Sequence, residues 1–79
     1  MGDPRPFTVF GFRSVHDALE AEAVLKQSGI TSIAIPSPRE LGELCGIALR
    51  VEIEQAYAAR EALEAAGRLP LATAEIIDR

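Results

Sequence analysis

The stretch IALRVEI, residues 47–53, sets the fold, because it has the clearest β-strand pattern in the sequence. Apolar side chains occupy every second position from Ile47 to Ile53, which makes one face of the strand apolar. Directly after it, residues 54–66 are rich in Ala, Glu and Leu, a composition that favours a helix, and Gly67 predicts the end of that helix. The second half of the chain therefore begins as a strand followed by a helix.

The first half of the chain has the same order. Residues 7–12 alternate in the manner of a strand, and Ser14 and Asp17 form the S-x-x-D pattern that caps a helix N-terminus. A helix is predicted over residues 15–28, and Gly29 stands where a helix end needs left-handed backbone. The apolar positions of this helix predict one wide buried face: Val15, Ala18, Leu19, Ala21, Val24 and Leu25.

Two further strands complete the pattern, one over residues 30–35 and a weaker one over residues 71–77. The resulting order β-α-β-β-α-β is typical of the ferredoxin-like α+β sandwich, in which two helices cover one face of a four-stranded antiparallel sheet. We expect a single domain over residues 7–79, preceded by a loose arm over residues 1–6 with two prolines.

Composition excludes several function classes. The 79 residues carry a formal net charge of −4, and the eight basic residues form no stripe, so a nucleic-acid partner is not expected. No apolar run approaches the ~20 residues that span a bilayer, and the N-terminus lacks the apolar core of a signal peptide, so we expect a cytoplasmic protein with no membrane partner. A single cysteine cannot form an internal disulfide or a zinc site by itself, and we expect no cofactor.

The segment PSPRELGELC, residues 36–45, separates two apolar strands and contains the only cysteine of the chain. Its two prolines stiffen the backbone, and loops of this length in small domains are often functional. Part of it, residues 38–44, is compatible with one or two helical turns, with Ser37 as cap and Pro38 at the first position. In the expected topology, this loop, the exit of the first strand and the end of the second helix share one pole of the domain. Cys45 would then lie near residues 11–16.

Two interpretations of Cys45 are open on the residues alone. A free cysteine commonly packs as a small buried apolar residue. Alternatively, Arg39, Arg50 and the nearby N-terminus of the first helix favour a reactive thiolate, whereas Glu40 and Glu43 oppose it.

The other candidate residues have two interpretations as well. His16, the only histidine, is either a solvated surface side chain or a proton-relay partner of Cys45. Arg39 and Arg50 either bind an anion or a partner's carboxylate, or form ordinary ion pairs with Glu40 or Glu52.

The residues also carry a resemblance. Residues 12–30, with HDAL at 16–19, the element IPSPREL at 35–41, and CGIALR at 45–50 together resemble the small bacterial family of selenium/sulfur (Se/S) carrier-like proteins. The resemblance covers roughly residues 7–77, and the Pro-Arg-Glu element followed by Cys-Gly-Ile-Ala is its most specific part.

The resemblance implies that Cys45 accepts sulfur or selenium as a persulfide or selenosulfide and passes it to an acceptor protein. The donor would be a cysteine desulfurase or an enzyme of the selenocysteine lyase type. Gly46 would let the partner's sulfur approach, and Arg39 would stabilise the anionic terminal atom. The expected site thus has Cys45 as the reacting residue and the following residues around it: Arg39, Gly46, Pro38, Glu40, Arg50 and His16.

Two other functions compete with the carrier. One is a small-ligand-sensing or protein-interaction module on a ferredoxin-like scaffold, in which the loop binds a small anion and Cys45 only packs. The other, which the sequence favours least, is an enzyme that uses Cys45 with His16, because neither a substrate pocket nor a third orienting group is evident. A small domain with few aromatic residues is also compatible with a homodimer formed through the open face of the sheet.

Overall fold

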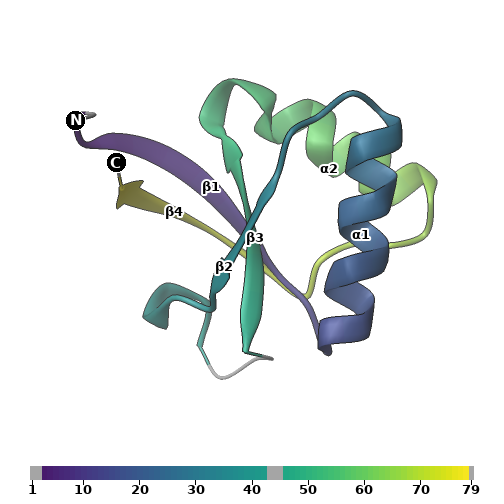
Figure 1. The fold of residues 1–79 in the computed structure, drawn as a ribbon, viewed down its shortest axis with the longest axis horizontal. Helices are drawn as coiled ribbons and strands as arrows, with labels where there is room; N and C mark the ends of the chain where they lie inside the picture. The colour runs from purple at the N-terminus through teal and green to yellow at the C-terminus, as the bar shows by residue number, and fades with distance from the viewer. Residues whose placement is uncertain (1–2, 43–45, 79) are drawn as a thin grey trace.

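In the computed structural model, which describes residues 3–42 and 46–78, the chain forms one four-stranded sheet with two helices on one side (Figure 1). The sheet order is β2-β3-β1-β4, and each pair of neighbouring strands is antiparallel. This is the predicted ferredoxin-like α+β arrangement. Its elements, in chain order, are β1 (Arg5–Gly11), α1 (Val15–Gln27), β2 (Ile33–Pro36), the 3-10 turn η1 (Arg39–Leu41), β3 (Ile47–Glu52), the 3-10 turn η2 (Ile53–Gln55), α2 (Ala56–Ala65) and β4 (Ala72–Asp78).

Local signals fix both ends of α1. The Ser14 hydroxyl accepts a hydrogen bond from the Asp17 amide at 3.1 Å, as the capping pattern predicts. At the other end Gly29 has a φ of 76°, and the Ile30 amide donates to the Leu25 carbonyl at 2.9 Å. This bond and the apolar contact between Ile30 and Leu25 are those of a Schellman cap. Ile30 therefore completes the helix end, and β2 begins three residues later than predicted.

Helix α2 ends in the same way. Gly67 has a φ of 71°, and the Arg68 amide donates to the Leu63 carbonyl at 2.8 Å. The other element boundaries differ from the prediction by one or two residues: β1 begins at Arg5 within the expected arm, β3 gives way to η2 at Ile53, α2 begins at Ala56, and β4 runs from Ala72 to Asp78.

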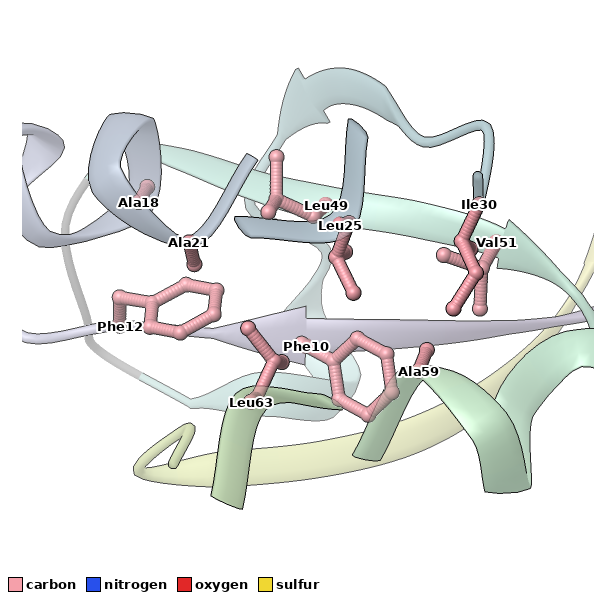
Figure 2. Packing of buried hydrophobic residues seen from close by; sticks show 10 residues of the cluster. All are labelled: Phe10, Phe12, Ala18, Ala21, Leu25, Ile30, Leu49, Val51, Ala59 and Leu63. Carbon is pink, nitrogen blue, oxygen red and sulfur yellow. The ribbon is translucent and has the colours of Figure 1, made fainter. Parts of the chain in front are cut away.

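The helix side of the sheet holds the larger core, a cluster of ten buried residues (Figure 2). In Figure 2 the rings of Phe10 and Phe12 lie between the sheet and small helix residues, with Ala21 over Phe12 and Ala59 beside Phe10. Alanines at these positions allow the helices to approach the rings closely. The predicted buried face of α1 is too wide, because Val15 and Leu19 are exposed.

The opposite, open face of the sheet has a second and smaller core. Val9 of β1 and Ala48 of β3 are fully buried there, and Leu41 of η1 packs on them. Phe7 lies further along this face and is also buried. Central strand β1 is therefore buried on both faces from Phe7 onward.

The two described ends of the chain are neighbours. Arg5 at the start of β1 pairs with Asp78 at the end of β4, and in Figure 1 the two ends lie side by side at the left. Gly11, at the other end of β1, pairs with Ala48 and Ala72. The loop between β2 and β3 therefore belongs to the end of the sheet that is remote from the termini.

Candidate functional site

The loop between β2 and β3 is closed at its base. Pro36 pairs with Ile47 at the end of the β2–β3 ladder, and the Ser37 amide donates to the Gly46 carbonyl at 3.1 Å. The residue that follows Cys45 in the chain is thus held against the end of β2.

A 3-10 turn forms the first half of this loop. The Leu41 amide donates to the Pro38 carbonyl at 3.1 Å, and the Gly42 amide donates to the Arg39 carbonyl at 3.0 Å. Gly42 ends the turn with a φ of 76°, a conformation that favours glycine. The predicted helical turn is thus present over Arg39–Leu41, and positions 43 and 44 of the prediction lie outside the described residues. Pro38 occupies the cap position in place of Ser37, and no side chain caps the turn.

Leu41 anchors this turn to the sheet. Its side chain is 6% exposed and packs with Val9 and Ala48, and η1 reaches over the open face as far as β4. Leu41 was not among the predicted site residues. The available signal was an isolated large apolar residue in the polar segment between Pro36 and Gly42.

Arg39 and Glu40 lie on the outer side of the turn and are exposed. Within the described part of the chain neither side chain forms an ion pair, so the expected Arg39–Glu40 pair is absent there. The anchored turn therefore presents one guanidinium and one carboxylate to solvent.

Gly46 adopts backbone that other residues accept, because its φ lies outside the left-handed region. A Cβ atom built on it would meet no heavy atom within 4 Å. Neither backbone conformation nor packing among the described residues requires glycine here. The open space beside Gly46 is instead compatible with the predicted approach of a partner.

Cys45 itself, with Glu43 and Leu44, lies outside the described residues. The prediction that the thiol stands near residues 11–16 therefore stays a prediction.

Arg50 belongs to another cluster, farther along the open face. Its guanidinium carbon lies 4.1 Å from the centre of the Phe7 ring, and its Nη1 lies 2.9 Å from Asp78 Oδ2. Its side chain is only 15% exposed. Of the two interpretations of Arg50, an ion pair is present, but its partner is Asp78 and not Glu52, which pairs with Arg5 at 2.7 Å. Arg50 thus joins β1, β3 and β4 on this face.

His16 stands in the first turn of α1 and is 80% exposed. Its Nε2 lies 3.5 Å from Glu20 Oε1, and the same carboxylate pairs with Arg68 at 3.2 Å. The Glu20–Arg68 pair confirms that the end of α2 and the start of α1 share one pole. The structure brings Pro38, Arg39, Glu40 and Gly46 together on one loop, and it places His16 and Arg50 in separate clusters.

Residues 3–42 and 46–78 contain neither a candidate metal site nor a candidate membrane span. There, no group of three or more His, Cys, Asp or Glu side chains could hold a metal ion. In the same residues no helix has the length and apolar character needed to cross a bilayer.

The sequence of residues 8–75 matches the family model described as "Putative Se/S carrier protein-like". The chain belongs to this Se/S carrier-like family. The match to the Se/S carrier-like family extends from β1 into β4 and includes the loop that contains Cys45. Neither a curated protein nor a solved structure matches the chain.

Proposed function

We propose that this Se/S carrier-like protein accepts one sulfur or selenium atom on Cys45 and transfers it to an acceptor protein. The observation that carries the proposal is that the only cysteine of a Se/S carrier-like chain follows an anchored 3-10 turn and precedes an open glycine. A donor of the cysteine desulfurase or selenocysteine lyase type would supply the atom.

The proposed loading step is a thiol exchange that needs no external oxidant. The Cys45 thiolate attacks the terminal sulfur of the donor's persulfide, a new S–S bond forms on Cys45, and the donor's S–S bond breaks. The donor leaves as a thiolate, so charge and protons balance. A donor selenosulfide would transfer selenium by the same exchange, and the attack of an acceptor thiolate would unload the carrier.

Two residues of the loop that contains Cys45 support this chemistry. Arg39 carries a guanidinium that the described residues do not neutralise, and it can stabilise the negative charge of a terminal sulfur or selenium atom. Gly46 leaves space beside its backbone for the donor's sulfur. The buried Leu41 side chain holds the turn that precedes Cys45 on the sheet, and the Ser37–Gly46 hydrogen bond holds the residue that follows Cys45 at the end of β2.

Intact-mass spectrometry tests the proposal. The reduced protein is incubated with a cysteine desulfurase and cysteine, or with a selenocysteine lyase and selenocysteine, and the reductant-sensitive addition of one sulfur or selenium atom is measured. We expect addition to the wild type and none to Cys45→Ser.

A second comparison tests Arg39. Arg39→Gln should load more slowly than the wild type, whereas Lys26→Gln should load normally, because it removes one positive charge from an exposed residue in the last turn of α1, at the opposite end of that helix from residues 11–16. No addition to the wild type with either donor would contradict the carrier. If a small anion then raised the melting temperature, and alkylation of Cys45 did not change that effect, the alternative binding module would be favoured.

A further inference from the structure

The two edges of the sheet differ in how well they are protected against pairing with another strand. Edge strand β2 has four residues and ends at Pro36, and short edge strands and prolines both discourage pairing. Edge strand β4 has seven residues, Ala72–Asp78, and contains no proline, glycine or lysine. Among the described residues, β4 pairs on one side only, with β1. The outer backbone groups of residues 73–77 pair with no other described strand.

The surface beside β4 is hollowed and partly apolar. A groove of about 440 Å³ runs between α2 and β4, and Tyr57 of α2 lines it. Tyr57 is 75% exposed, and Ile77, on the same face of β4 as the groove-lining Glu75, is 69% exposed. These are the two most exposed large apolar side chains of the described residues, and both border this edge.

The same groove contains two opposite charges that do not neutralise each other. Arg60 of α2 and Glu75 of β4 both line it, yet within the described residues neither forms an ion pair. A strand that docks on β4 must therefore accommodate the Glu75 carboxylate at the centre of the edge strand and the Arg60 guanidinium of α2 beside it.

We propose that β4 pairs antiparallel with β4 of a second copy of this chain, so that two four-stranded sheets become one continuous sheet of eight strands. A two-fold axis at Glu75 places Ala74 opposite Ile76 and Thr73 opposite Ile77 of the second copy. On the open face, Ala74 and Ile76 already border the small core, so this pairing extends the apolar surface across the axis.

Charge favours a second copy as the occupant. At the axis the two Glu75 carboxylates face each other, which alone would oppose pairing, but each copy also contributes one Arg60 to the same surface. The two carboxylates and two guanidiniums balance, which lets Glu75 of one copy pair with Arg60 of the other. The open face of the sheet, by contrast, is partly covered by η1, which favours pairing along the backbone of β4 over packing of two open faces.

Sedimentation velocity over a range of protein concentrations tests the proposal. We expect the wild type to form a dimer. Glu75→Lys puts four positive charges at the axis and Arg60→Glu puts four negative charges there, so each should raise the dimer dissociation constant at least tenfold. The double variant Arg60→Glu/Glu75→Lys exchanges the charges and should recover most of the affinity. Glu61→Lys is the matched control, because this exposed residue of α2 does not line the groove, and it should leave dimerisation unchanged.

Circular dichroism shows whether each single variant is folded, and the double variant keeps the test decisive if one is not. A wild type that stays monomeric at every concentration would overturn the proposal. A dimer that persists in the folded single variants would overturn it as well. Loading of sulfur on Cys45 is measured separately, so this result does not depend on the carrier function.

Discussion

The two faces of one sheet are closed by different means. On the helix side, two capped helices cover a cluster of ten buried residues. On the open side, the three-residue turn η1 lies over a cluster of three buried residues, Val9, Leu41 and Ala48. The turn itself contributes only Leu41 to this cluster. The comparison indicates that global stability depends on the helix side, whereas the position of the loop between β2 and β3 depends on the open side.

The largest effect is expected from the helix side. Phe10→Ala removes a 1% exposed ring between the sheet and α2, and such substitutions cost about 3–5 kcal/mol of unfolding free energy. Urea unfolding followed by circular dichroism measures the loss. Phe10→Leu, which retains much of the volume, should lose less. A small loss for Phe10→Ala would mean that the helix side is not the dominant core.

Leu41→Ala should cost about 2 kcal/mol, at the low end for a buried leucine, because a short turn at the surface can relax into the space. Hydrogen exchange should accelerate in the loop and remain unchanged in α1 and α2. Leu69→Ala makes the same change at a residue that is 47% exposed, and it should cost less than about 0.5 kcal/mol. If exchange accelerated equally in the loop and the helices, the two faces would unfold as one unit.

Gly42→Ala should cost about 1–2 kcal/mol, because the left-handed backbone at a φ of 76° is strained for a residue with a Cβ atom. Among the described residues beyond its chain neighbours, no heavy atom lies within 4 Å of the added carbon, so these residues add no crowding. The change in urea midpoint measures this cost. Asparagine tolerates left-handed backbone better, so Gly42→Asn should cost less than Gly42→Ala, and the reverse order would contradict the explanation.

The smallest effect on stability is expected at Gly46. Gly46→Ala should leave the free energy of unfolding unchanged or raise it by up to about 1 kcal/mol, because its φ is not left-handed and the added carbon has space. The same variant should load sulfur more slowly if the donor approaches past Gly46. A stable variant with normal loading would separate Gly46 from the proposed transfer.

Most of the helix side could be predicted from the sequence, because its signals are local. Ser14, Gly29 and Gly67 set helix ends through contacts within a few residues, and the alternation in residues 47–53 marks a strand. The wrong start predicted for β2 has a physical reason as well. Ile30 is apolar and β-branched like the strand that follows, but its amide is taken by the cap of α1.

The open face could not be predicted in the same way, because its contacts join residues that are far apart in the sequence. Leu41 reaches Val9, and Arg50 pairs with Asp78 of β4 across 28 positions. No periodic pattern identifies such partners. The sequence therefore located the loop and its candidate residues, and the structure was needed to show that Leu41 anchors the loop and that Arg50 belongs to the Phe7 cluster.

The pairing of Arg5 with Asp78 has a practical consequence. Strand β1 rises ~3.3 Å per residue, so this junction lies about 20 Å from Gly11 at the loop end of the sheet. A short linker across the junction would allow a circular permutant with new ends between Arg68 and Leu71, in an exposed connection outside the sheet. A fluorophore attached near Asp78 would report tumbling while leaving the cysteine loop untouched.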